Sequence, residues 1–254
     1  MALKQRLDEI RRIIRQEKKV VVSDLSKQFN VTEETIRRDL DKLEAEGLVA
    51  RTYGGAVLNL DMSSENIDFT RRAQTNLDEK MVIAALAADK IPLNATISAD
   101  ASSTVVEALN VFGERPDMTV LTYSIKAIEN LGDSGIRLIS TGGIVNKKTC
   151  AFKGPITQKI LDGYHTEAVL FSCKALSLEG GIFDSNEEEV ELKKIMIARG
   201  QRVILLADHS KFGKVAFVRL ADIKDIDMLI TDQKPADEWI ALLEKNGVQL
   251  VFPE

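Results

Sequence analysis

The 254-residue chain contains only two cysteines and two histidines, and it has no long apolar run. Cys150 and Cys173 have no Cys or His neighbour at the spacing of metal ligands, so we expect no disulfide framework, no metal site and no cofactor. No stretch approaches the roughly 20 apolar residues that cross a bilayer, and the first residues lack the apolar core of a secretory signal. The sequence therefore predicts a cytoplasmic protein without membrane contact.

An excess of basic residues is missing as well, since 34 Lys and Arg face 39 Asp and Glu and the net charge is -5. The charge is unevenly divided. Residues 1–58 hold 12 basic and 10 acidic residues, a net of +2, which leaves 22 basic and 29 acidic residues, a net of -7, from residue 59 onward. A net of +2 attracts DNA only weakly, so DNA binding must depend on where the charges lie.

Residues 1–58 predict three helices followed by a β-hairpin. Apolar side chains recur at helical spacing in the first helix, and a short second helix has Ser23 or Asp24 as its expected cap. The third helix begins after Thr32 as its N-cap and ends at Gly47. Two short apolar segments around a Gly-Gly turn then predict a hairpin. This order is typical of a winged helix-turn-helix.

The third helix is expected to bury Ile36, Leu40 and Leu43, which leaves its polar side chains on the exposed flanks. Arginine pairs bidentately with guanine or clamps a phosphate in the major groove, and a glycine-rich wing tip approaches the sugar-phosphate backbone closely. The candidate DNA-binding residues are Thr32, Glu34, Thr35, Arg37, Arg38, Lys42, Arg51, Tyr53, Gly54 and Gly55. The alternative is that the two adjacent arginines are solvated surface charges paired with acidic neighbours such as Asp41.

From residue 59 to 77 the sequence is polar with little periodicity, which predicts a linker. Residues 78–254 then alternate helical stretches with short apolar runs, a pattern that indicates an α/β domain with a mainly parallel sheet. The expected helices are 80–90, 104–111, 125–131, 190–199 and 236–245. The expected strands are 96–99, 119–122, 137–140, 168–171, 202–207, 228–231 and 249–252.

Polar residues follow five of these strands, at the edge where parallel sheets bind ligands. Asp100 and the hydroxyl residues after it open a helix, whose positive end suits a phosphate. One such segment alone is more often a helix cap or a turn, but five at one edge favour a site for a phosphorylated polyol. The candidate effector-binding residues at these strand ends are Asp100, Ser102, Ser103, Thr104, Thr122, Tyr123, Ser124, Thr141, Gly142, Gly143, Ser172, Lys174, Asp208 and Lys211.

The sequence resembles the DeoR family of bacterial transcriptional regulators. The motif that carries the resemblance is Thr35-Ile36-Arg37-Arg38-Asp39-Leu40, followed by Leu43-Glu44, Gly47, Arg51 and Tyr53-Gly54-Gly55-Ala56. Tyr53 stands where many members have His. Further along, the residues that match the family's entry into its effector domain are Phe69, Arg72, Asn76 and Lys80. That domain is similar to sugar-phosphate isomerases of the ribose 5-phosphate isomerase type.

The resemblance adds Asn186, Glu189 and Lys193 to the effector-binding candidates. Their i, i+3, i+7 spacing puts them on one helical face, while Ser185 with Glu188 would form a capping box in the same segment. The sequence also departs from the family, which usually has Gly at the position of Ser102 and Asn at that of Tyr123. These departures predict a pocket of different shape.

The resemblance implies a repressor of a sugar-catabolic operon that binds double-stranded operator DNA as a homo-oligomer and is released by a phosphorylated sugar. Two other functions are open. An isomerase with an appended DNA-binding module would use Asp100, Asp208 or Glu189 to move a proton. A constitutive DNA binder would use the second domain only to oligomerise, and would not require polar residues at so many strand ends. Neither His165 nor His209 is expected to be catalytic.

Overall fold

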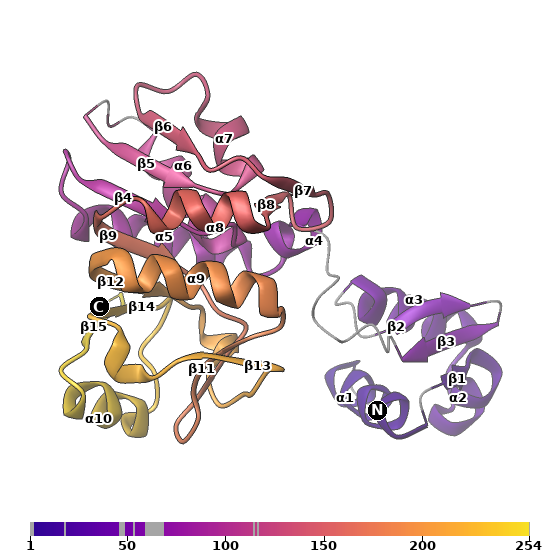
Figure 1. Ribbon diagram of the computed structural model, residues 1–254. Coiled ribbons are helices and arrows are strands. Elements are labelled where there is room, and N and C mark those ends of the chain that lie inside the picture. Colours follow the sequence, from indigo (N-terminus) through magenta and orange to yellow (C-terminus); the bar gives the residue numbers. More distant parts are fainter. Residues whose placement is uncertain are drawn as a thin grey trace. The chain divides into compact units, whose positions relative to one another are not determined.

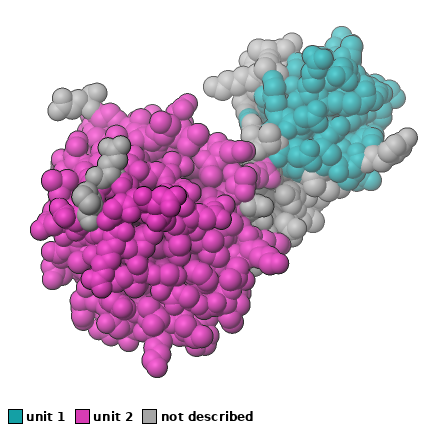
Figure 2. Space-filling model, turned by 90° about the horizontal axis from the view of Figure 1, so that it is seen from above, with its two compact units in different colours: residues 1–65 teal, residues 66–254 magenta. Residues whose placement is uncertain are grey.

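The computed structural model describes residues 3–17, 19–45, 49–52, 54–58, 69–113, 115 and 117–253. The chain divides into two compact units, residues 1–65 and residues 66–254 (Figure 2). Each unit has its own hydrophobic core among the described residues.

Unit 1 is a winged helix-turn-helix, as predicted. Its elements are α1 (Leu3–Glu17), β1 (Lys19–Val21), α2 (Val22–Phe29), α3 (Glu33–Ala45), β2 (Val49–Thr52) and β3 (Gly55–Leu58). The hairpin strands form an antiparallel sheet of order β1-β3-β2. The predicted stripe of Ile36, Leu40 and Leu43 is fully buried, and it packs with Ile10 and Ile14 of α1.

The start of α2 differs from the prediction that Ser23 or Asp24 caps it. The helix begins at Val22 directly from β1, and its N-cap Val21 makes no side-chain cap. The backbone N–H of Val22 donates instead to the carbonyl of Gly54 at 2.9 Å. The pairing of β1 with the hairpin therefore sets where this helix begins, and a three-residue strand gives no periodic pattern that would predict it.

Unit 2 is an α/β domain around a seven-stranded sheet of order β15-β14-β12-β9-β4-β5-β6, in which every neighbouring pair is parallel. The strands are β4 (Thr96–Ala99), β5 (Thr119–Thr122), β6 (Arg137–Ser140), β9 (Thr166–Phe171), β12 (Gly200–Leu206), β14 (Met228–Ile230) and β15 (Gln249–Val251). The main helices are α5 (Leu77–Lys90), α6 (Ser103–Phe112), α7 (Ile125–Leu131), α8 (Pro155–Asp162), α9 (Glu187–Arg199) and α10 (Asp237–Lys245). Figure 1 shows α8 and α9 in front of the sheet and α5 behind it.

Both faces of this sheet are buried, as expected for parallel strands covered by helices. Alternate residues of β9 enter two separate cores. Leu170 packs in the core that contains Ile83 of α5, whereas Phe171 packs in the core that contains Val190 of α9 and Trp239 of α10.

Part of the predicted linker 59–77 is helical. Helix α4 (Phe69–Gln74) and the first residue of α5 lie inside that range, and residues 59–68 lie outside the described residues. Phe69 is buried, and its backbone N–H donates to the carbonyl of Lys148 at 2.9 Å. One apolar anchor in a six-residue helix gives no helical periodicity, so the sequence pattern does not predict α4.

The sequence pattern also omits helix α8, a hairpin and a second small sheet. The hairpin consists of β7 (Ile144–Asn146) and β8 (Ala151–Lys153). The antiparallel sheet has the order β10-β11-β13, with β10 (Ala175–Ser177), β11 (Gly181–Asp184) and β13 (Val218–Ala221). Strands of three or four residues are too short for an alternation of apolar and polar residues to stand out.

Candidate functional site

Two adjacent arginines lie on the exposed side of α3. The side chains of Arg37 and Arg38 are 47% and 75% exposed. Arg37 pairs with Glu33 at 2.7 Å, and Arg38 pairs with Glu34 at 3.3 Å. The surface-charge alternative expected a partner such as Asp41. The observed partners are instead the acids of the first helical turn. Exposed pairs of this kind contribute about 0–1 kcal/mol, so a phosphate or a guanine can replace them at little cost.

The start of α3 carries two hydroxyls in a cap. Thr32 Oγ1 accepts a hydrogen bond from the N–H of Thr35 at 3.3 Å and lies 2.9 Å from Thr35 Oγ1. Thr32 is thus the N-cap, as predicted. Glu34 and Lys42 are exposed on the same helix.

Arg51 of the wing is engaged within unit 1. Its Nε lies 3.2 Å from Asp41 Oδ1, and its Nη1 donates to the carbonyl of Gly55 at 3.1 Å. A Cβ at Gly55 would lie 2.1 Å from the carbonyl oxygen of Val20, so this position needs glycine for the pairing of β1 with β3. Gly54 has a positive φ of 83° and open space around it, which fits a wing tip. Tyr53 lies outside the described residues.

A buried ion pair that the sequence pattern did not indicate joins two helices of unit 1. Arg6 Nε lies 2.6 Å from Asp39 Oδ2, and both side chains are buried. Asp39 belongs to the family motif, and this contact gives it a structural role between α1 and α3.

In unit 2, the ammonium of Lys193 connects the strand ends. Its Nζ donates to the carbonyl of Ser172 at 2.8 Å, lies 3.2 Å from Asp100 Oδ2, and donates to Asp184 Oδ2. Burial alone would lower the pKa of Lys193, but the carboxylates of Asp184 and Asp100 raise it well above its ordinary value. The N–H groups of Ser102 and Ser172 also donate to the Asp100 carboxylate, at 2.9 and 3.0 Å.

The end of β12 presents a second carboxylate. Asp208 Oδ1 accepts from Asn76 Nδ2 at 3.1 Å and from the N–H of Ser210 at 2.9 Å. Its Oδ2 is buried without a hydrogen-bond partner, and Lys211 Nζ lies 3.7 Å away. Burial would raise the pKa of Asp208, but Lys211 and the hydrogen bonds outweigh burial and lower it. Asn76 was matched to the family but was not among the predicted effector-binding residues.

Lysine side chains near these carboxylates are partly desolvated. Burial, then the charge of Lys211, lowers the pKa of Lys174. Burial, then the charge of Lys211, lowers the pKa of Lys80 to about 8. The Nζ of Lys80 donates to the backbone carbonyls of Arg72 and Thr75, so it caps the C-terminal end of α4.

Several predicted ligand-binding hydroxyls make bonds within the fold. Ser102 caps α6 by accepting from the N–H of Val105 at 3.3 Å, and Ser124 caps α7 by accepting from the N–H of Ala127 at 3.2 Å. The Thr122 hydroxyl donates to the carbonyl of Ala99 at 2.8 Å. The Thr122 hydroxyl has thus used its one donor within the fold, whereas Ser102 and Ser124 accept in their caps and keep an O–H donor.

The remaining predicted hydroxyls at the strand ends are buried. Ser103 Oγ donates to the carbonyl of Arg72 at 3.2 Å, so the N-terminal turn of α6 holds α4. Thr104 is buried beside it. Thr141 Oγ1 donates to the carbonyl of Gly142 at 3.1 Å, and Gly142 and Gly143 both have positive φ angles, as a tight turn requires.

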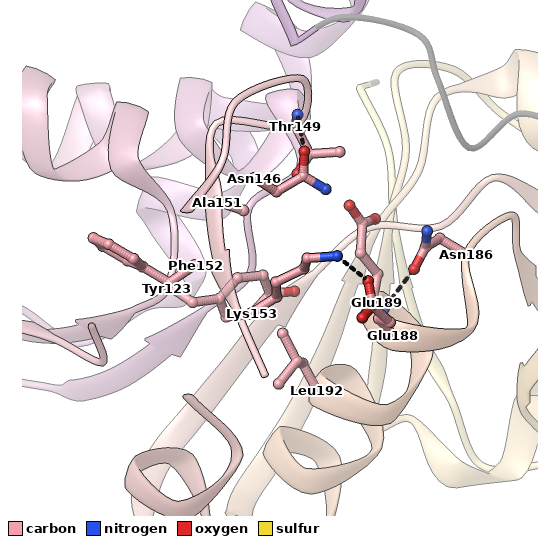
Figure 3. A pocket seen from close by; sticks show the side chains of 10 residues that line it. All are labelled: Tyr123, Asn146, Thr149, Ala151, Phe152, Lys153, Asn186, Glu188, Glu189 and Leu192. Carbon is pink, nitrogen blue, oxygen red and sulfur yellow. Dashed lines mark hydrogen bonds and ion pairs between the residues drawn. The ribbon is translucent and has the colours of Figure 1, made fainter. Parts of the chain in front are cut away.

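A small pocket lies beside the Lys193 cluster (Figure 3). Asn146 and Thr149 lie on one side and Asn186, Glu188 and Glu189 on the other, and Lys153 pairs with Glu188 at 2.6 Å. Burial, then the charge of Asp184, raises the pKa of Glu189. The Asn186 side chain caps α9 by accepting from the N–H of Glu189 at 3.0 Å, so the expected capping box of Ser185 with Glu188 is wrong.

Tyr123, the departure from the family pattern, lines the same pocket and is almost fully buried. Burial, then the charge of Asp100, raises the pKa of Tyr123 well above its ordinary value, so its hydroxyl is neutral.

The structure therefore brings Asp100, Ser172 and Lys193 into direct contact, with Asp208 and Lys211 at the next strand end. Asp184 completes the cluster, and the strand-end pattern missed it because β11 is not part of the parallel sheet. Among the described residues no group of three or more His, Cys, Asp or Glu side chains is arranged to hold a metal ion. None of the described helices is long and apolar enough to cross a membrane.

Two family models match the chain. The model of the DeoR-like helix-turn-helix domain matches residues 6–61, and that of the DeoR C-terminal sensor domain matches residues 75–233. The two matches fall on unit 1 and unit 2, respectively.

Curated relatives match over nearly their whole length. The HTH-type transcriptional regulator YulB of Bacillus subtilis is 39% identical over 98% of this chain and 96% of its own. The L-fucose operon activator of Haemophilus influenzae is 35% identical over 94% of this chain and 96% of its own. The HTH-type transcriptional repressor GlcR of B. subtilis is 34% identical over 100% and 98%. Among solved structures, ribose 5-phosphate isomerase A of Methanocaldococcus jannaschii is 16% identical over 54% of this chain and 55% of its own, with a TM-score of 0.42.

Proposed function

We propose, from the fact that this chain belongs to the DeoR family of transcriptional regulators, that it represses a sugar-catabolic operon and is released from its operator by a phosphorylated sugar. DNA binding is assigned to residues 1–58, effector binding and oligomerisation to residues 78–254, and the connection to residues 59–77. A cytoplasmic location follows from this function, since a regulator must reach chromosomal DNA.

The operator surface in this proposal is the exposed side of α3. Arg37 and Arg38 are its base- or phosphate-contacting residues, with Lys42 beside them and Gly54 at the wing tip. The support is their exposure on a helix whose opposite side is fully buried, together with ion-pair partners that surface exchange can replace. Arg51 and Gly55 contribute by holding the wing, because both make contacts within unit 1.

The observation that carries the effector proposal is the concentration of cations at the carboxyl ends of β9 and β12. Lys174 and Lys211 lie at or beside these ends, where a parallel sheet binds ligands, and Lys193 balances the buried charges of Asp100 and Asp184 between them. Lysine ammonium groups bind phosphate as point charges. One relative is named an L-fucose operon activator, and another is named the HTH-type transcriptional repressor GlcR. Release of a repressor by the sugar phosphate lets an operon respond to its own substrate.

The sugar phosphate in this proposal is an effector that is bound and left unchanged. Asp100 is a poor proton acceptor for an isomerase reaction, because both of its oxygens are engaged by backbone N–H groups and by Lys193. The relatives are also named as transcriptional regulators, which supports an effector over a substrate.

Thermal-shift measurements on the full chain test the effector class. A panel of sugar phosphates is compared with the same sugars without phosphate at equal ionic strength. We expect at least one sugar phosphate to raise the melting temperature in a saturable way and its unphosphorylated form to have no effect. Equal stabilisation by both forms would contradict a phosphate-dependent effector.

The proposal includes a homo-oligomer that binds two operator half-sites. One winged helix with a net of +2 makes few phosphate contacts, and a symmetric dimer doubles them. Light scattering after size-exclusion chromatography should give at least twice the 28.1 kDa mass of one chain. A monomer that binds a single half-site with full affinity would contradict this part.

A further inference from the structure

A second cavity lies beyond the ends of β12 and β14. Its volume is about 260 Å³, whereas an apolar cavity of about 150 Å³ already holds a benzene ring. Its lining shares no residue with the pocket in Figure 3. The lining residues are His209, Phe212, Gly213, Thr231, Gln233, Lys234, Pro235, Ala236 and Trp239. The cavity is therefore large enough for a single ring and is separate from the pocket beside Lys193.

The imidazole of His209 is held in one orientation at this cavity. Asp232 Oδ1 accepts from the backbone N–H of His209, and Asp232 Oδ2 lies 2.6 Å from His209 Nδ1. An ionised carboxylate only accepts hydrogen bonds, so Nδ1 carries the proton, and Nε2 of the neutral imidazole is an acceptor. No residue that the structure describes donates to Nε2. A carboxylate that is 6% exposed thus orients an imidazole that is 44% exposed, and leaves its outer nitrogen open to a donor.

Aromatic side chains form much of the apolar lining. Trp239 is buried, and its ring meets that of Phe212 edge to face, with the ring centroids 4.9 Å apart. Pro235 and Ala236 add apolar surface. Aromatic rings attract one another in such arrangements beyond the effect of area alone. The lining therefore favours an aromatic ring over an aliphatic one of the same size.

The charges near the cavity do not select an ion of either sign. Lys234 lines the cavity and has no ion-pair partner within the described part of the chain. Asp237 and Glu238 follow it, exposed, in the first turn of α10. The carboxylate of Asp232 is engaged by His209. One cation thus faces two exposed acids, which favours a neutral ligand.

A polyol would find few partners in this lining. Its polar side chains other than Lys234 are His209, Thr231 and Gln233. The Thr231 hydroxyl lies 3.3 Å from Asp232 Oδ1 and donates to it. A sugar ring would therefore bury several hydroxyls against apolar atoms without a partner, which is costly. A ring with a single donor avoids this cost.

We propose that this cavity is a second ligand site, which binds a neutral monocyclic aromatic molecule through ring contacts with Trp239 and Phe212 and through one O–H or N–H donor to His209 Nε2. The proposal does not depend on the sugar phosphate, because neither the lining nor the ligand class involves a phosphate. His209 and Lys211 belong to the same 3₁₀ turn, His209–Lys211, so the second ligand binds next to the proposed effector site.

Tryptophan fluorescence of the full chain tests the site, because Trp239 is the only tryptophan. The probe is phenol, and three compounds of similar size each change one feature. Anisole lacks the O–H donor, cyclohexanol lacks the aromatic ring, and benzoate carries a negative charge. We expect phenol to change the Trp239 emission in a saturable way, and each of the other three to need an about five-fold higher concentration for half-saturation.

Variants locate the binding site. His209→Ala should bind phenol only as well as the wild type binds anisole. His165→Ala is the matched control, because His165 is the chain's other histidine and lies exposed before the amino end of β9. Ala236→Leu should abolish the response to phenol by filling the cavity. Proton NMR gives a second readout that needs no change in the cavity. The His165→Ala spectrum assigns the imidazole signals of His209, and phenol should shift these signals in the wild type.

A fluorescence response that does not saturate, or wild-type binding of phenol by His209→Ala, would overturn the site. Imidazole signals of His209 that phenol does not shift would overturn it as well. Equal binding of phenol and anisole would overturn the hydrogen bond to Nε2, and tighter binding of benzoate would overturn the neutral class. Displacement of phenol by the sugar phosphate with the largest thermal shift would show that the cavity belongs to the effector site and would overturn its independence.

Discussion

Replacement of Lys193 by methionine separates a structural role of this lysine from a purely ligand-binding one. The substitution preserves most of the side-chain volume and removes the ammonium that two carboxylates share. Asp100 and Asp184 then remain buried without their counter-ion. Breaking a buried ion pair by removing one partner costs about 3–5 kcal/mol. For a domain of this size 1 kcal/mol shifts the melting temperature by about 2–4 °C, so the expected loss is about 6–20 °C.

The sign of the pH dependence follows from the same geometry. Without Lys193, Asp100 and Asp184 are buried anions that have no counter-ion. A low pH relieves this cost by protonating them, and a high pH restores it. The melting temperature of Lys193→Met should therefore differ from that of the wild type less at pH 5 than at pH 8.

Differential scanning calorimetry at the two pH values measures both effects. The control is Lys194→Met, because Lys194 is half-exposed and its ion-pair partner among the described residues is the exposed Glu191. We expect that variant to change stability by no more than about 0.5 kcal/mol. A Lys193→Met transition that matches the control, or a loss that is the same at pH 5 and pH 8, would refute the role of Lys193 as the counter-ion of the strand ends.

Three further predictions concern the two proposed binding surfaces. Arg37→Ala and Arg38→Ala should each weaken specific operator binding by about 1–3 kcal/mol in gel-shift titrations at fixed salt, with melting temperatures unchanged. Arg12→Ala on α1 is the control and should bind as the wild type does. Wild-type affinity in both α3 variants would exclude this helix from the groove. Lys211→Ala and Ser103→Asp should bind operator normally but need at least about ten-fold more sugar phosphate for release, because one loses a cation and the other adds an anion at the strand ends. If the sugar-phosphate concentration at half-release is unchanged in both variants, these positions do not belong to the site. Proton NMR of the bound sugar phosphate in deuterated water should show no exchange of carbon-bound protons at enzymatic rates, and steady exchange would establish an isomerase.

The sequence pattern was sufficient for the architecture because apolar runs and helical periodicity report on burial. All seven predicted strands of the parallel sheet are present within one or two residues of their expected bounds, and the buried stripe of α3 is the one expected from spacing. The elements that were missed are short. The strand β1 and the helix α4 depend on partners elsewhere, namely the wing hairpin and the strand ends, and local periodicity does not encode such partners.

The strand-end rule correctly predicted that polar side chains gather at one edge of the sheet, but it did not predict which of them make bonds within the fold. Ser102, Thr122 and Ser124 are polar because they cap helices or bridge strands. Asp184 was missed because β11 does not belong to the parallel sheet. Tertiary packing places it beside the strand ends, where it contacts Lys193.

The most direct measurement of the account as a whole is operator release as a function of sugar-phosphate concentration. The full chain is bound to a fluorescent duplex selected in vitro from random sequences, and the dissociation constant is followed by anisotropy as each sugar phosphate of the panel is added. The account predicts that one of them weakens operator binding about 5- to 150-fold in a saturable way, the range of typical coupling free energies, and that the same sugar without phosphate does not. Operator affinity that stays constant across the panel, or that responds equally to the unphosphorylated sugar, would contradict it.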